Sequence, residues 1–120
     1  MKHLIFQLPD GSPIKVWQAT SILARMKGLL GRKSLPEREA MLLDPCGSIH
    51  TFGMRFAIDV VFLDADWQVI GTRTNLRPGC LAWGGWRARR TIEAASGWLD
   101  LDSLTGKRLT PQQLQVPEQK

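Results

Sequence analysis

The sequence predicts a mainly β or α+β protein: a small mixed β-barrel-like domain with one three-turn helix and one short C-terminal helix. Seven or so short strand-like runs follow one another along the 120 residues, without the strand–helix alternation of a doubly wound sheet. One run, residues 56–63, is apolar on both faces, which is typical of a strand covered on both sides. We expect a single compact domain over residues 1–110 and an extended C-terminal tail over residues 111–120.

The predicted strands begin with a hairpin at the N-terminus. Residues 4–6 and 14–17 are strand-like, and Pro9-Asp10-Gly11-Ser12 between them is a strong turn signal. Further strands are expected at residues 40–43, 48–54, 56–63, 68–75 and 90–95 and near 108–109. Residues 79–86 have the composition of a loop, and Ser96 is expected to cap a short helix that runs to Leu104.

The clearest helix in the sequence is expected between Thr20 and Gly31. Its apolar residues recur at helical spacing and form one stripe: Ile22, Leu23, Met26, Leu29 and Leu30. Arg25 projects beside this stripe, as does Arg32 if the last turn persists. Both arginines can therefore reach inward past the edge of the helix.

The composition is that of a globular protein, with 43% apolar and 22% charged residues. No run approaches the roughly 20 apolar residues that span a bilayer, and the first residues lack the pattern of a secretory signal, so we expect a cytoplasmic protein without a membrane span. Two cysteines, Cys46 and Cys80, are too few for a disulfide framework and are most simply thiols in a reducing compartment. The formal net charge of +5 favours acidic partners or nucleic acid electrostatically, without indicating specificity.

Unusual polar residues gather in a short block of the sequence. Asp59 lies in the middle of an apolar strand, where an unpaired carboxylate is costly to bury, so it needs partners. Arg55, Arg25 and Arg32 are the expected donors. We favour a structural ion pair, or a carboxylate that ties loop amides. The functional alternative is a pocket lined by His50, Arg55, Asp59 and a helix arginine, which would hold a small anionic ligand or a protein segment carrying a carboxylate.

Catalysis and metal binding are weaker hypotheses for the same block. His50 could act as a general base in a small hydrolase or transferase, with Asp59 as its orienting group. Cys46, Ser48 and Thr51 are the nucleophiles that could complete such a triad, yet no flanking nucleophile motif is present. A zinc site from Cys46, His50 and Cys80 lacks the paired spacing of known sites, so we expect no metal and no cofactor.

A basic and aromatic surface is the third candidate: Trp83, Trp86, Arg87, Arg89 and Arg90. Indole and guanidinium groups in alternation can stack on bases and hold phosphates, which makes nucleic-acid binding an alternative function. The simpler interpretation is a solvated basic loop whose tryptophans fold back on the core. The glycines form neither a P-loop nor a dinucleotide-binding motif.

Several stretches of the sequence resemble the signatures of one family. Residues 25–32 with 40–43 are similar to its first signature, residues 50–55 with 58–64 to its second, and residues 91–97 to a weaker third. On these stretches the chain, from about Ala19 to Leu109, resembles the domain of unknown function 192 family, also called uncharacterised protein family 0127. The resemblance implies a compact mixed β-barrel-like fold and no established activity, substrate or cofactor. Many relatives carry an N-terminal export signal, from which this sequence departs.

Together these observations favour a small non-catalytic binding or accessory module. The sequence names neither its ligand, its partner nor its oligomeric state.

Overall fold

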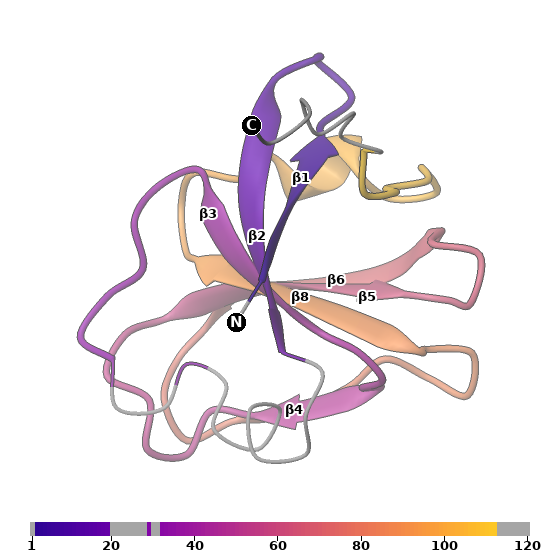
Figure 1. Ribbon diagram of the computed structural model, residues 1–120. Coiled ribbons are helices and arrows are strands. Elements are labelled where there is room, and N and C mark those ends of the chain that lie inside the picture. Colours follow the sequence, from indigo (N-terminus) through magenta and orange to yellow (C-terminus); the bar gives the residue numbers. More distant parts are fainter. Residues whose placement is uncertain (1, 20–28, 30–31, 113–120) are drawn as a thin grey trace.

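The structure is a computed structural model, and it describes residues 2–19, 29 and 32–112 (Figure 1). In chain order its elements are β1 (His3–Gln7), β2 (Pro13–Ala19), β3 (Glu39–Leu43), β4 (Ser48–His50), β5 (Ile58–Leu63), β6 (Val69–Leu76), β7 (Leu81–Trp83), β8 (Arg90–Ala95) and a 3-10 turn, η1 (Leu101–Ser103). Six strands form one large sheet in the order β1-β2-β3-β8-β5-β6, and β4 pairs with β7 in a separate two-stranded sheet. All neighbouring strands are antiparallel except β2 and β3.

Both faces of the large sheet are covered by apolar side chains, because successive residues of a strand point to opposite faces. The face that we call the first core packs against the C-terminal part of the chain through Val61, Leu63, Ile92, Ala94, Leu101, Leu104 and Leu109. The opposite face, the second core, packs against the small sheet through Met41, Ile58, Val60, Phe62, Ile49 and Ala82. Every residue of β5 is buried, which confirms the prediction that this strand is covered on both sides.

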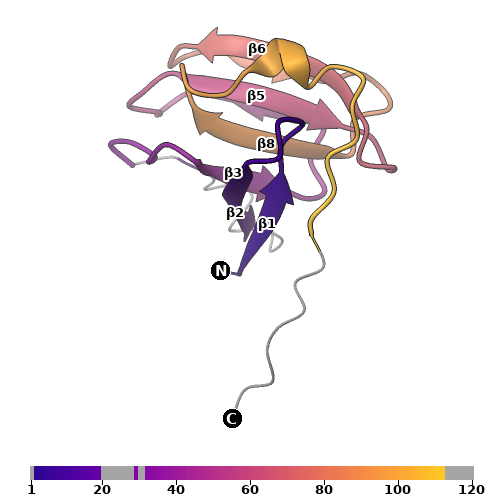
Figure 2. The same cartoon turned by 90° about the horizontal axis from the view of Figure 1, so that it is seen from above.

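The large sheet is open, so the predicted barrel closure is wrong. β1 and β6 stand at its two edges and do not pair with each other. Residues 106–112 instead run as a strap along both edges, from above β6 down past β1 (Figure 2). The N–H of Leu109 donates to the C=O of Trp67 at 2.9 Å, and the N–H of Gln112 donates to the C=O of Ile5 at 2.7 Å. Pro111 has no N–H to donate, so the strap makes isolated bridges and no continuous strand.

The chain is mainly β, and neither predicted helix is seen as such. The three-turn helix falls on residues 20–31, of which all but Leu29 lie outside the described residues. The expected C-terminal helix is one 3-10 turn, η1, since Gly97 has a φ of +106° and Asp100 makes no side-chain cap. No helix in the described part of the chain is long and apolar enough to cross a membrane.

The remaining differences concern the ends of strands. The strand expected at residues 48–54 ends at His50, because Thr51 begins a turn that passes through Gly53 at a φ of +82°. The stretch expected to be a loop, residues 79–86, contains β7. Pro111 and Gln112, at the start of the predicted tail, lie against β1.

Candidate functional site

The small sheet presents one row of side chains to the protein and the other to solvent. Ile49 and Ala82 point inward and belong to the second core. The alternate residues point outward and are exposed: Ser48 and His50 on β4, and Leu81 and Trp83 on β7. The register places Ser48 opposite Trp83 and His50 opposite Leu81. A two-stranded layer therefore carries a mixed aromatic and apolar outer face.

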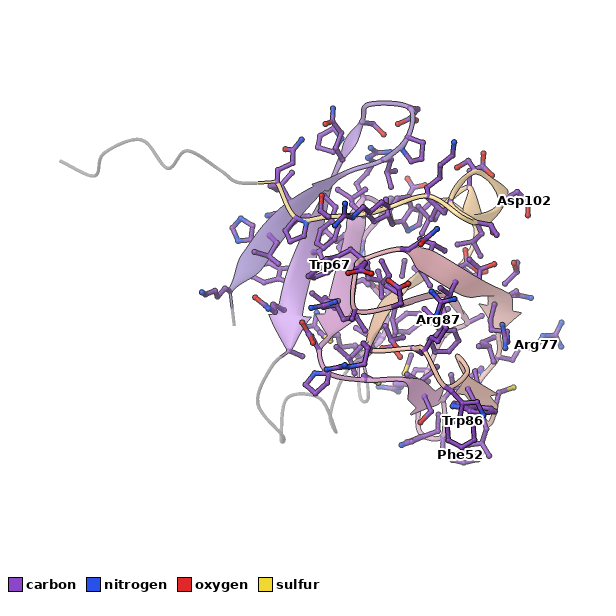
Figure 3. The ribbon with its side chains drawn as sticks, turned by 90° about the vertical axis from the view of Figure 1, so that its right-hand side faces the viewer. Phe52, Trp67, Arg77, Trp86, Arg87 and Asp102 are labelled. Atoms are coloured by element: carbon purple, nitrogen blue, oxygen red, sulfur yellow. The ribbon has the colours of Figure 1, made fainter. Side chains whose placement is uncertain are left out.

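This outer face contains a hollow of about 450 Å³, which we call the aromatic hollow. It is lined by Ser48, Ile49, His50, Leu81, Ala82 and Trp83. Two further rings extend the apolar surface. The His50 ring stacks on Phe52 with centroids 5.5 Å apart, and Trp83 meets Trp86 edge to face at 5.0 Å. Phe52 and Trp86 both lie at the surface on the same side of the molecule in Figure 3.

Exposed apolar surface is concentrated at this one place. The large apolar side chains that are exposed in the described part of the chain are Phe52 (50%), Leu81 (74%), Trp83 (52%) and Trp86 (92%), and all four belong to the hollow or its extension. Single exposed apolar residues are ordinary on protein surfaces, whereas a contiguous group of them marks an interaction site.

Two glycines allow the small sheet to pack closely, Gly84 against Phe62 of the large sheet and Gly47 against Ala88 between β7 and β8. The N–H of Gly84 donates to the C=O of Gly47 at 2.9 Å, which closes one end of the β4–β7 pair. A Cβ atom on Gly84 would lie 2.5 Å from Cγ of Phe62 and 2.8 Å from Cβ of Ala88. A Cβ atom on Gly47 would lie 2.8 Å from the C=O oxygen of Ala88. The close approach therefore requires glycine at both positions.

Gly84→Ala is expected to lower the free energy of unfolding by about 1–3 kcal/mol, because the Phe62 ring is fully buried and cannot move aside without repacking the second core. Urea denaturation followed by tryptophan fluorescence measures the change. Gly71→Ala is the matched control, since its new Cβ would meet nothing closer than 3.8 Å. Equal losses in the two variants would contradict this account of Gly84.

Arginines are the charged residues of the chain segments that carry and flank the small sheet. Residues 45–58 and 67–92, which include β4, β6 and β7, contain no Asp or Glu and six arginines: Arg55, Arg73, Arg77, Arg87, Arg89 and Arg90. Three of these are held by protein groups. Arg73 donates to the C=O of Trp83 at 3.1 Å, Arg87 pairs with Asp64 at 3.0 Å, and Arg90 pairs with Asp44 at 3.0 Å.

The other three arginines, Arg55, Arg77 and Arg89, are exposed, and their side chains make no hydrogen bond or ion pair within residues 2–19, 29 and 32–112. Arg77 is fixed beside the end of β4 by Thr51, a fully buried residue. The hydroxyl of Thr51 donates to the C=O of Arg77 at 2.6 Å and accepts from the N–H of Cys80 at 2.7 Å. Arg77 extends on the same side of the molecule as Phe52 and Trp86 (Figure 3).

The sequence signatures and this fold agree with a family assignment. The family model described as uncharacterized ACR, DUF192, matches residues 5–110. The chain belongs to the DUF192 family. Comparison with the curated proteins gives no significant match.

Two solved structures share the DUF192 fold seen here. One is a protein of unknown function from Novosphingobium aromaticivorans DSM 12444, with a TM-score of 0.77 and 16% identity over 90% of this chain and 83% of the other. The second is a candidate transcription regulator from Sinorhizobium meliloti 1021, with a TM-score of 0.75 and 18% identity over 91% of this chain and 92% of the other. At such identities the likeness concerns the fold alone.

The structure separates the residues that were expected to line one polar pocket of this DUF192 domain. Asp59 lies directly opposite Ala94 on the face of the first core, whereas His50 lies on the small sheet that covers the second core. The two side chains are therefore on opposite sides of the large sheet. Arg55 and Arg32 are exposed at the surface, and Arg25 lies outside the described residues.

Asp59 is bound by amide and hydroxyl groups where arginines were expected. It is 2% exposed, and one of its oxygens accepts the N–H of Asn75 at 2.8 Å and the hydroxyl of Ser96 at 3.2 Å. The other oxygen accepts the N–H of Gly97 at 3.2 Å. Ser96 and Gly97 belong to the turn after β8 and Asn75 to β6, so the carboxylate ties backbone amides, one of the structural roles that the sequence favoured.

The predicted basic and aromatic surface is also divided. Trp83, Trp86 and Arg89 lie at the surface beside the hollow, and Arg87 is held by Asp64. Arg90 is elsewhere: its guanidinium lies 3.9 Å from the centroid of the Trp67 ring and donates to the C=O groups of residues 64 and 65. The expectation that the two tryptophans fold back on the core is wrong, since both are exposed.

The residues drawn into a hydrolytic triad do not form one. The Thr51 hydroxyl is buried and bonded on both sides, and the thiol of Cys46 donates to the C=O of Ser48 at 3.0 Å. His50 stacks on Phe52, and no carboxylate within the described residues accepts a hydrogen bond from it. Among the same residues no group of three or more His, Cys, Asp and Glu side chains is placed to hold a metal ion.

Sequence reasoning missed another buried carboxylate, Glu93. It is 4% exposed, lies between Met41 and Val60 of the neighbouring strands, and makes no hydrogen bond within the described part of the chain. Burial raises its pKa to about 7. The sequence does contain a signal for this residue, because Glu93 lies inside the largely apolar run Thr91–Ala95. As for Asp59, a carboxylate within an apolar strand is expected to be buried at a cost.

Proposed function

We propose that this chain is a binding module, and that its aromatic hollow holds the apolar part of an anionic ligand. The observation that supports this most is the concentration of the exposed large apolar side chains around one hollow in an arginine-containing, acid-free part of the chain. Covering one such aromatic or aliphatic side chain contributes on the order of 2 kcal/mol. The exposed arginines add attraction for a negative group. We expect the module to act in the cytoplasm, as the sequence indicates.

Binding is favoured over the two other functions on geometric grounds. A general base needs an orienting partner, and His50 instead gives one ring face to Phe52. Nucleic-acid binding would draw on Arg87, Arg89 and Arg90, yet two of these are held in ion pairs with the protein. The hollow, by contrast, needs no further group to receive an apolar side chain.

N-acetylphenylalanine is a suitable probe, because it joins one ring to one carboxylate. We expect it to shift the backbone amide NMR signals of β4 and β7 and the indole signals of Trp83 and Trp86. N-acetylphenylalaninamide, which lacks the charge, is expected to bind more weakly. Leu81→Ser should weaken binding at least about fivefold, the equivalent of roughly 1 kcal/mol.

Trp98→Phe is the control variant, since Trp98 packs against the first core on the other side of the large sheet. It should bind the probe as the unaltered chain does. The proposal fails if the amide signals of β4 and β7 do not move, or if Leu81→Ser binds as tightly as the control.

A further inference from the structure

We infer that the natural ligand of the aromatic hollow is an extended acidic segment of a partner protein, which lies along β4 and places one apolar side chain in the hollow. The inference rests on the proposed function and names its partner. Three features of the small sheet carry it: its outer strand edge, the positions of the unpaired arginines, and the mutual packing of the aromatic rings.

The outer edge of β4 offers backbone groups for pairing. The two ends of the β4–β7 pair are hydrogen-bonded, from Thr51 to Cys80 and from Gly84 to Gly47. Bonded and non-bonded pairs alternate in antiparallel strands, so the N–H and C=O of His50 point away from β7. Within residues 2–19, 29 and 32–112 nothing bonds to them. An extended peptide can add to such an edge, and its alternate side chains then point into pockets.

Two of the unpaired arginines lie beside the small sheet. The backbone of Arg77 is held near the end of β4 by the hydroxyl of Thr51, which donates to its C=O, and its side chain stays unpaired among the described residues. Arg89 lies on the Trp86 side, where it lines a second hollow of about 240 Å³ together with Arg87 and with two carboxylates, Asp64 and Asp66. A partner that carries acidic residues next to an apolar residue therefore matches the exposed arginines Arg77 and Arg89. A second copy of this chain does not, since it would bring its own arginines against these.

The packing of the rings favours a peptide over single-stranded nucleic acid. Bases stack on open aromatic faces. Here the rings of Trp83 and Trp86 meet at 87°, and the ring of His50 is stacked on Phe52. Part of the surface of each ring is therefore covered by the neighbouring ring. The depression between the two ring pairs has room for one side chain. A lipid surface has no single side chain to place there.

The test uses the peptide Ac-EDFDE-NH2 with the full chain, in NMR titrations at low salt. We expect it to bind about tenfold more tightly than N-acetylphenylalanine, since backbone pairing and flanking carboxylates are added. Methylating the amide nitrogens beside the phenylalanine should weaken it about tenfold. Arg77→Gln should weaken it about threefold, whereas Lys107→Gln, which removes an equal charge from the strap, should not.

The inference is overturned if the methylated peptide binds as tightly as the parent, or if Ac-KRFRK-NH2 binds equally well. It is also overturned if twelve-nucleotide oligo-dT, or vesicles of phosphatidylserine and phosphatidylcholine, bind the hollow where the acidic peptide does not. In each of these cases a response to N-acetylphenylalanine still supports the binding module, so the two proposals can fail separately.

Discussion

Asp59→Ala is expected to lower the free energy of unfolding by about 4 kcal/mol. The substitution removes the acceptor of two backbone N–H groups, those of Asn75 and Gly97, and of the Ser96 hydroxyl, at a site where the carboxylate is 2% exposed. Each buried donor left without a partner costs roughly 1–3 kcal/mol, and bonds to a charged acceptor are the stronger kind. Equilibrium denaturation in urea measures the loss.

Two companion variants make the Asp59 result specific. Asp59→Asn keeps one oxygen for Asn75 and Ser96 but turns an amide toward the N–H of Gly97, so about half of the loss is expected. Asp100→Ala removes an exposed carboxylate that caps nothing, and it should change stability by less than about 0.5 kcal/mol. A loss for Asp59→Ala no larger than for Asp100→Ala would show that the loop amides do not depend on this side chain.

Glu93→Gln is expected to stabilise the protein at pH 8 by roughly 3 kcal/mol. In the native state burial raises the pKa of Glu93 from 4.5 to about 7. Above pH 7 the folded protein must hold an ionised carboxylate between Met41 and Val60, whereas the unfolded chain hydrates it freely. Glutamine has nearly the same shape and no charge, so it avoids this cost.

The pH dependence follows from the direction of the shift. Below about pH 4.5 Glu93 is protonated in both states, and its full contribution to stability is present. As the pH rises toward 7 the unfolded chain loses this proton first, so the free energy of unfolding falls; above 7 this contribution levels off. The pKa of Asp64 is lowered from 3.8, chiefly by the N–H of Gln68. Titration of Asp64 therefore changes the stability below about pH 3.8, outside the range in which Glu93 does so.

Thermal unfolding of the unaltered chain and of Glu93→Gln between pH 4.5 and 8 tests this account. The two curves of stability against pH should meet near pH 4.5 and diverge as the pH rises. Glu37→Gln, at an exposed position, is the control and should follow the unaltered chain. Parallel curves for the chain and Glu93→Gln would contradict a raised pKa of this carboxyl group in the native state.

The strands were largely predictable because local patterns decide them. The hairpin of β1 and β2 follows from its turn residues, and β5 follows from its continuous apolar run. Whether the large sheet closes into a barrel could not be predicted from local sequence patterns. Whether the two edges of the large sheet meet depends on the path of residues 106–112, where Pro111 interrupts the pairing.

The candidate site was only partly predictable. His50 was singled out, but Asp59 was placed beside it, since a sequence does not show which face of which sheet a strand residue occupies. Leu81 was passed over because glycine and tryptophan gave residues 79–86 the composition of a loop. Leu81 becomes a candidate binding residue through its position opposite His50, a strand pairing between residues some thirty positions apart in the sequence.

The strap has a consequence for synthesis of the chain. The amide of Gln112 reaches the side chain of Gln7, a contact across 105 positions of sequence. While a ribosome is still adding the last of these residues, β1 and β6 expose unsatisfied backbone to other nascent chains. We therefore expect native folding to depend on these long-range contacts, and chains whose strap has not yet docked to associate more readily than the folded domain.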